Sequence, residues 1–180
     1  MIPEISTQLN AVIRSLDTII KPCLEGSNPL ALEQINLCIK TLEMVNLRYP
    51  YLDKYLRSDI EANIQLGREL LALNNKATDD NANQRLDSTV KKSQAIISSS
   101  ETGLLELQAI VQELREELTE WIKLSNAQGF NKDVNRLVLA QAEAMVLKGR
   151  SWNVLLGFEQ HAEKLPKIES LLSGTQIKGC

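Results

Sequence analysis

The segment from Leu86 to Trp121, LDSTVKKSQAIISSSETGLLELQAIVQELREELTEW, decides the fold class. Its apolar positions recur at alternating steps of four and three residues once Ser93 and Ser100 are counted with them. These positions are Leu86, Val90, Ile97, Leu104, Leu107, Val111, Leu114, Leu118 and Trp121. A repeat of 3.5 residues is typical of helices that pack along a coiled-coil-like seam. The segment therefore predicts helix, with a packing partner along the seam.

Two arrangements of this helical segment are compatible with the sequence. One is a single helix over about residues 82–125, roughly 65 Å long at about 1.5 Å per residue. The other is a pair of helices separated at Ser98-Ser99-Ser100-Glu101-Thr102-Gly103, where Ser98 and Glu101 match a capping box. Because the phase of the seam continues through the serine run, the pattern favours one long helix.

Three further helices are expected before the seam. Apolar residues at helical spacing predict helices from about Pro3 to Leu24, from Pro29 to Arg48, and from just after Tyr49-Pro50 to about Leu73. Pro22 is expected to kink or end the first helix, Gly26 to follow its end, and Asn28 to cap the second. Because the linker is short, the first two helices should form an antiparallel hairpin. The polar residues 74–81 are expected to form the main internal loop.

The C-terminal part of the chain predicts one more long helix. Asn131 suits an N-cap, and the helix is expected from Lys132 to about Leu165. Its segment 137–147 is apolar nearly all round, which is typical of a central helix. A short helix over 167–173 and a flexible tail over 174–180 should follow. We therefore expect residues 1–180 to form a single all-α domain, a helical bundle of about five long helices.

Charge and composition argue against several classes of partner. The net charge is −3, and no block of Lys or Arg stands out, so nucleic acid is not expected. The longest apolar run is too short and too polar to span a bilayer, and no N-terminal signal pattern is visible. The three cysteines form no CxxC motif, and Cys23 and Cys38 should lie too far apart to pair. Reduced, mostly buried thiols and a cytoplasmic location are expected.

The residues needed for common active-site chemistry are sparse. A His-containing di-iron site in a bundle needs two Glu-x-x-His motifs, whereas the one histidine, His161, has Phe158 three residues before it. No GxxxxGK[ST] or GxGxxG loop is present. An all-carboxylate site on the helix that carries Glu113 and Glu117 is left open, as is a base role for His161, although solvent-exposed side chains explain these residues more simply. We predict no catalytic residue, no metal and no cofactor.

Three groups of residues are candidates for interaction. The tyrosine–arginine patch contains Arg48, Tyr49, Tyr51, Tyr55 and Arg57, types that are enriched at interfaces. In the alternative interpretation, the tyrosine rings brace the helix junction while the arginines reach solvent. The second group is the segment Lys148-Gly149-Arg150-Ser151-Trp152, although Trp152 continues an apolar helix face and is more simply explained as core. The third group is the seam, formed by Leu104, Leu107, Val111, Leu114, Leu118 and Trp121. The protein's own helices or a second copy can fill the seam, and we favour a homodimer.

The start of the chain resembles a family of bacterial proteins. Ile19-Ile20-Lys21-Pro22-Cys23-Leu24-Glu25-Gly26, followed by Lys40-Thr41-Leu42-Glu43-Met44-Val45, is similar to the N-terminal part of small, uncharacterised helical proteins. Those proteins are encoded near acyl-CoA dehydrogenase-like and aminoglycoside-phosphotransferase-like enzymes. The resemblance covers about the first quarter of the chain and transfers no site residue. It implies an accessory role near acyl-thioester metabolism.

These observations together predict a non-catalytic helical bundle. We expect it to act through protein–protein contacts, either with itself or with another helical protein. The alternative is an accessory protein that binds a small apolar ligand or an acyl group, in a pocket between the apolar helix segment 137–147 and the tyrosine–arginine patch.

Overall fold

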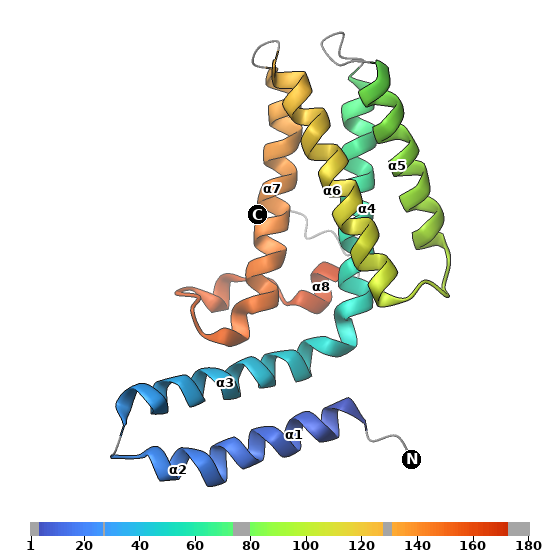
Figure 1. Cartoon of the computed structure of the whole chain (residues 1–180). Helices are drawn as coiled ribbons and strands as arrows, with labels where there is room; N and C mark the ends of the chain where they lie inside the picture. Colours follow the sequence, from blue (N-terminus) through green and yellow to red (C-terminus); the bar gives the residue numbers. More distant parts are fainter. Residues whose placement is uncertain (1–3, 27, 74–79, 128–130, 173–180) are drawn as a thin grey trace. The chain divides into compact units, whose positions relative to one another are not determined.

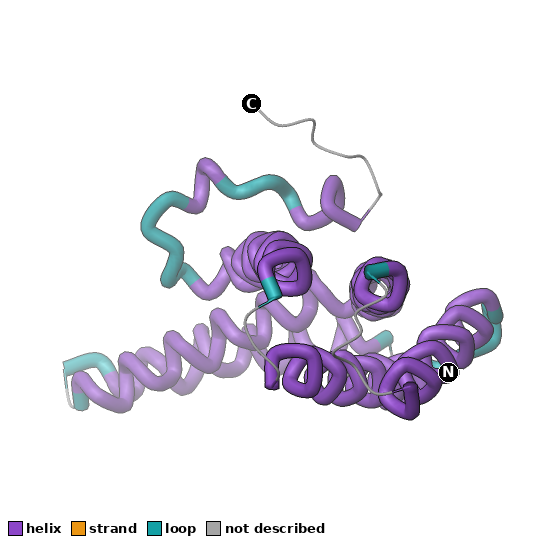
Figure 2. The backbone as a smooth tube through the Cα atoms, turned by 90° about the horizontal axis from the view of Figure 1, so that it is seen from above, coloured by secondary structure: helices purple, strands orange, loops and turns teal. Residues whose placement is uncertain are grey.

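A computed structural model describes residues 4–26, 28–73, 80–127 and 131–172. These ranges contain helices and loops and no strand (Figure 2), which confirms the all-α class. The chain divides into two compact units, where the sequence led us to expect one bundle. The first unit comprises Met1–Tyr51 with Lys148–Cys180, and the second is Leu52–Leu147. Within the described ranges, no helix is both long and apolar enough to cross a membrane.

The second unit is built on α4 (Leu52–Ala72), α5 (Asp80–Ser98) and α6 (Leu104–Ala127), which lie side by side (Figure 1). The first part of α7 (Lys132–Asn153) adds to it. The largest fully buried apolar side chains of its core are Ile60, Ile64, Leu70, Leu86, Leu107, Ile110, Leu114, Trp121 and Val134. The indole Nε1 of Trp121 donates to Asn83 Oδ1 at 2.8 Å, so the one polar atom of this ring is satisfied.

The seam-bearing segment forms two helices, and the expectation of one long helix is wrong. α5 ends at Ser98 and α6 begins at Leu104. Between them, the hydroxyl of Thr102 donates to the carbonyl of Ile96 at 2.9 Å, and Ser99 Oγ accepts from the amide of Glu101 at 3.3 Å. Serine and threonine side chains compete in this way for backbone groups that a helix would use. The 3.5-residue repeat continues across the break because α5 and α6 each pack one apolar stripe against the same core.

α7 is not the central helix that its apolar composition predicted. Of its residues, all of which the structure describes, Val134 and Ser151 are buried, whereas Leu139 is 62% exposed and Val146 is also exposed. The helix ends at Asn153, about 12 residues earlier than expected, and a 3-10 turn at Val154–Leu156 follows. Gly157 then adopts a φ of 81°, a left-handed conformation that ends the helical path.

The first unit contains a hairpin of α1 (Ile5–Ser15), α2 (Lys21–Leu24) and α3 (Pro29–Arg48). A π-helical turn at Leu16–Ile20 joins α1 to α2. It ends two residues before Pro22, which has no amide hydrogen to donate to an earlier carbonyl, so the helix is distorted at the place where a kink was expected.

The predicted end of the first helix and start of the second are confirmed. Gly26 has a φ of 79°, and the side chain of Asn28 accepts from the amide of Ala31 at 3.1 Å. Asn131 caps α7 in the same way, because its Oδ1 accepts from the amides of Asp133 and Val134. Most of the polar loop 74–81, the tail 174–180 and Cys180 lie outside the described residues.

The C-terminal segment completes the first unit. It contains the turn Val154–Leu156, a 3-10 turn at Ala162–Lys164 and the short helix α8 (Ile168–Leu172). Arg150 holds the segment to α7 through a two-pronged ion pair with Glu159, whose shortest contact is 2.8 Å. This hydrogen-bonded pair raises the pKa of Arg150 and lowers the pKa of Glu159. The predicted helix between 154 and 165 is replaced by turns.

Candidate functional site

The tyrosine–arginine patch is divided between the two units. Arg48, Tyr49 and Tyr51 belong to the first unit, whereas Tyr55 and Arg57 belong to the second. Neither unit therefore builds the five-residue patch by itself. The two arginines also differ from the alternative interpretation, in which they reach solvent, because both donate to main-chain carbonyls near the end of another helix.

Arg57 interacts with the C-terminal end of α5. Its Nη1 donates to the carbonyls of Ile97 at 2.9 Å and Ser99 at 3.1 Å, and its Nε donates to Asp53 Oδ2 at 2.9 Å. The last carbonyls of a helix have no partner within the helix and carry its partial negative charge. Arg57 satisfies these groups, so it stabilises the break between α5 and α6.

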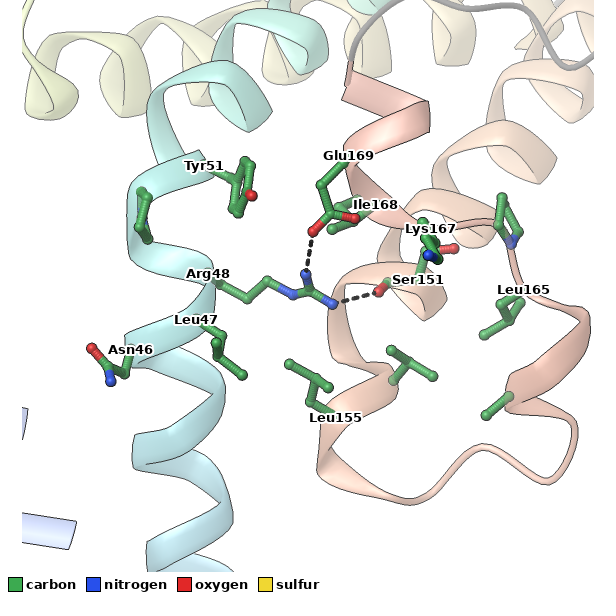
Figure 3. Close-up of a pocket in the computed structure, with 14 residues that line it drawn as sticks. Asn46, Leu47, Arg48, Tyr51, Ser151, Leu155, Leu165, Lys167, Ile168 and Glu169 are labelled. Atoms are coloured by element: carbon green, nitrogen blue, oxygen red, sulfur yellow. Dashed lines mark hydrogen bonds and ion pairs between the residues drawn. The ribbon is translucent and has the colours of Figure 1, made fainter. Parts of the chain in front are cut away.

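Arg48 satisfies carbonyl groups at the C-terminal end of α7 in the same way, and its side chain is drawn in Figure 3. The Nε atom donates to the carbonyl of Trp152 at 3.1 Å, and Nη2 donates to the carbonyl of Ser151 at 3.2 Å. Nη1 lies 3.6 Å from Glu169 Oε1 of α8. The guanidinium carbon is 5.8 Å from the centre of the Trp152 ring, within reach of a cation–π interaction. Arg48 is 8% exposed and links α3 to the C-terminal segment.

A pocket of about 560 Å³ surrounds Arg48, and we call it the arginine pocket. Figure 3 shows that its walls come from the end of α3 with the turn after it, from the end of α7 and from the C-terminal segment. Its lining residues are Asn46, Leu47, Arg48, Pro50, Tyr51, Ser151, Val154, Leu155, Ala162, Leu165, Pro166, Lys167, Ile168 and Glu169. Most of these side chains are apolar, and the charged groups are two cations and one carboxylate. The sequence placed Arg48, Tyr51 and Ser151 among the candidates but missed the residues from Val154 to Glu169, because the expected long helix hid the turns that carry them.

Ser151 is the most unusual polar residue of the arginine pocket. Its side chain is almost fully buried, and its hydroxyl has no hydrogen-bond partner within the described part of the chain. A buried hydroxyl without a partner costs roughly 1–3 kcal/mol. The pocket therefore retains a polar group that a bound molecule would satisfy.

A second hollow lies on the hairpin, and we call it the hairpin groove. It is open, has a volume of about 930 Å³, and carries no charged side chain among the described residues that line it. Those residues are Leu16, Leu24, Asn28, Leu30, Ala31, Gln34, Ile35, Leu37, Cys38, Thr41 and Leu42. None of the eleven residues of α1 is buried, and Leu30 is 67% exposed. Leu16, which lines the groove, belongs to an apolar stripe that also repeats in steps of four and three, formed by Ile5, Leu9, Val12, Leu16, Ile19 and Cys23.

The seam itself lies inside the second unit. Leu107, Val111, Leu114, Leu118 and Trp121 are buried, and Leu104 packs against them half-buried. α4 and α5 cover this stripe, since both pack on α6. The protein's own helices thus fill the seam, which corrects the expectation that a second copy would occupy it.

A polar cluster joins α4 to α6 beside the seam. Arg115 Nη2 donates to Asp59 Oδ2 at 2.8 Å, and the Asp59 side chain is almost fully buried. Burial raises the pKa of the Tyr55 hydroxyl, the carboxylate of Asp59 raises it further, and Arg115 lowers it. The cluster stabilises the unit but faces none of the hollows described above.

The remaining reactive side chains are scattered. His161 is exposed, as expected, but lies in a loop before a 3-10 turn, with its Nδ1 3.6 Å from Glu163. Cys23 and Cys38 are free and exposed, which corrects the expectation of buried thiols. No group of three or more His, Cys, Asp or Glu side chains suited to a metal ion occurs in the described residues.

Comparisons of the chain with protein-family models, with curated proteins and with solved structures give no match.

Proposed function

We propose that this protein acts through protein–protein contacts and forms a homodimer through the hairpin groove. The observation that carries the proposal is the uncharged, open apolar face that α3 and the α1–α2 arm present together. The proposed role is non-catalytic, as predicted from the sequence. The surface proposed for self-association is the hairpin groove instead of the seam. Exposed, unpaired Cys23 and Cys38 fit a reducing compartment such as the cytoplasm.

The groove exposes large apolar side chains to solvent. Leu30 and Leu37 line it and are 67% and 39% exposed. Apolar side chains left open to water gain free energy when a partner covers them, at roughly 25 cal/mol per Å². The hairpin groove therefore favours an apolar partner surface.

A second copy is the occupant that suits the groove best. A surface without charges favours a partner surface without charges, and the same face of a second hairpin meets that condition. Two hairpins that pack face to face form a four-helix bundle, which is closed and uses identical patches on both chains. Charged residues of the hairpin such as Asp17 and Lys21 pair with each other at 3.1 Å and are absent from the groove lining that the structure describes.

Substitution of Leu30 by Glu tests the proposal with little risk to the fold. Leu30 is exposed and lies in the first turn of α3, where a carboxylate is favourable to the helix. Light scattering and sedimentation from 1 to about 100 μM should show a dimer for the native chain and a monomer for Leu30→Glu. Leu105→Glu is the matched control, because Leu105 is 83% exposed and lies in the first turn of α6. It should remain dimeric.

The thiol of Cys38 gives a second, independent measurement. In a Cys23→Ser/Cys180→Ser variant, Cys38 is the only thiol of the chain. Alkylation of Cys38 should slow as protein concentration rises, because dimer formation covers the groove that it lines. A native chain that is strictly monomeric at 100 μM, or alkylation independent of concentration, would contradict the homodimer. Dimers that survive Leu30→Glu would place the contact elsewhere.

A further inference from the structure

The arginine pocket exposes apolar side chains that the C-terminal segment leaves uncovered. Leu155 is 41% exposed and Leu47 is also exposed, although both line the pocket. Together with Leu165 they form an apolar wall. A volume of about 560 Å³ falls in the range of roughly 300–1,000 Å³ that is typical of small-molecule sites. The size and lining suit the apolar body of a small ligand.

The charges of the pocket favour an anionic group. Arg48 and Lys167 are cations, and Glu169 is the one carboxylate among the described lining residues. The distance of 3.6 Å between Arg48 and Glu169 exceeds the 2.7–2.9 Å of a close charge-assisted hydrogen bond. Because the Glu169 side chain is about half exposed, solvent weakens this ion pair.

Ser151, whose hydroxyl is unsatisfied, is a neighbour of the same cation. Arg48 Nη2 already donates to the carbonyl of Ser151, so the two residues are neighbours in the pocket wall. The hydroxyl has no partner in the described residues and can donate to an anionic oxygen. A cation and a buried donor therefore converge at one end of an apolar pocket.

We propose that the arginine pocket binds a small monocarboxylate that carries an apolar chain. The carboxylate lies near Arg48, Ser151 and Lys167, and the chain lies along Leu47, Leu155 and Leu165. This inference is independent of the homodimer, because none of the pocket residues lines the hairpin groove. It assigns the polar end of the pocket a binding role in addition to the structural role of Arg48.

Three probes with the same chain length separate the contributions of charge and chain. Calorimetric titration of the full-length protein with decanoate, decanol and decyltrimethylammonium, each below its aggregation concentration, should show binding of decanoate. Decanol should bind at least about tenfold more weakly, because it lacks the charge that Arg48 and Lys167 attract, and the cation should not bind. Equal binding of decanoate and decanol would overturn the carboxylate assignment, and so would the absence of decanoate binding at millimolar concentration.

Variants that keep Arg48 can locate the binding site. Arg48 itself is not substituted, because its loss would also loosen the C-terminal segment. Leu155→Trp should fill the pocket and weaken decanoate binding at least about tenfold, whereas Ser151→Ala and Lys167→Ala should each weaken it about fivefold. Leu139→Trp, at an exposed leucine of α7, is the matched control and should bind like the native chain.

The hairpin groove provides the competing location for any apolar probe. Leu30→Glu should leave decanoate binding unchanged. If Leu30→Glu abolishes binding while Leu155→Trp does not, the ligand occupies the hairpin groove and the inference is wrong. Amide chemical-shift changes that follow decanoate and concentrate at Ser151 and Leu155 would support it, and changes confined to residues 16–42 would contradict it.

Discussion

Gly67 shows how closely α4 and α5 approach one another. A Cβ atom added at this position would lie 2.7 Å from Val90 Cγ2, and Leu86 and Leu118 would be its next neighbours at 3.7 Å. Contacts of 2.7 Å between carbon atoms are strongly repulsive, and the β-branched Val90 has little freedom to turn away. The glycine is therefore retained for packing, although it lowers the intrinsic stability of α4.

Substitution of Gly67 by Ala should destabilise the protein. Alanine gains about 1 kcal/mol in helix propensity, but overpacking costs about 1–3 kcal/mol, so we expect a net loss of about 1 kcal/mol in urea unfolding. Gly149→Ala is the control, because a Cβ there meets no atom within 4 Å. It should stabilise α7 by up to about 1 kcal/mol. Equal effects of the two substitutions would show that helix propensity alone governs both positions.

Tyr55 makes the stability of the protein depend on alkaline pH. Burial raises the pKa of its hydroxyl above the ordinary value of 10.0, Asp59 adds to the rise, and Arg115 opposes it. The folded state thus holds the phenol proton more tightly than the unfolded state does. The corresponding stability is fully present below pH 10 and is lost as the pH rises through the folded-state pKa.

A variant with a single tyrosine isolates this titration. In Tyr49→Phe/Tyr51→Phe, Tyr55 is the only tyrosine of the chain, and its absorbance should show ionisation at a pH above 10. The loss of unfolding free energy above pH 10 should be shallower in Tyr55→Phe than in the native chain. An ionisation midpoint at or below 10 would contradict the effect of burial.

At the scale of helices and turns, the break between α5 and α6 depends on Arg57. This side chain donates to the carbonyl of Ile97, in the last turn of α5, and to that of Ser99, directly after the helix. Hydrogen bonds from a charged donor contribute about 1.5–3 kcal/mol when buried, and partial exposure of Arg57 reduces this contribution. Arg57→Gln should therefore lower the unfolding free energy by about 1 kcal/mol.

Arg68 provides the matched comparison between the same two helices. It donates to Gln94 Oε1 at 3.0 Å on the exposed surface, and it contacts no main-chain carbonyl in the interactions described. Arg68→Gln should change the unfolding free energy by less than about 0.5 kcal/mol. Hydrogen exchange at the end of α5 should rise in Arg57→Gln and remain unchanged in Arg68→Gln.

The boundaries of these elements were predictable where a local residue dictates them. Gly26, Asn28 and Asn131 act through their own backbone or side chain, so their positions follow from the sequence. The break at Ser99 was the less favoured of the two arrangements, because the local serines and threonine do not reveal that a bond from Arg57, 42 residues away in the chain, also stabilises it. The same reason explains why the sequence missed the C-terminal wall of the arginine pocket, which Arg48 connects to α3 across more than 100 residues.

Across the whole molecule, the apolar residues are divided unequally between the units. The continuous buried core and the half-buried residues that pack on it lie between Leu52 and Val138, wholly inside the second unit. The buried apolar side chains of the first unit are Ile35, Ile39 and Ile168 among the described residues. Helix periodicity predicted the helices of both units equally well. It does not show which apolar stripe packs against another helix of the same chain. That depends on which helices the turns bring together.

The second unit should therefore fold by itself as a monomer. A fragment of residues 52–147 retains the complete core and has a size at which single domains are commonly stable. We expect helical circular dichroism, a cooperative thermal transition and a monomeric mass at 100 μM, because its seam is already filled and the hairpin groove is missing. A non-cooperative transition would show that the first unit supplies part of the core. A fragment that dimerises as tightly as the full chain would place self-association on the second unit and contradict its assignment to the hairpin, since no residue of the groove remains in it.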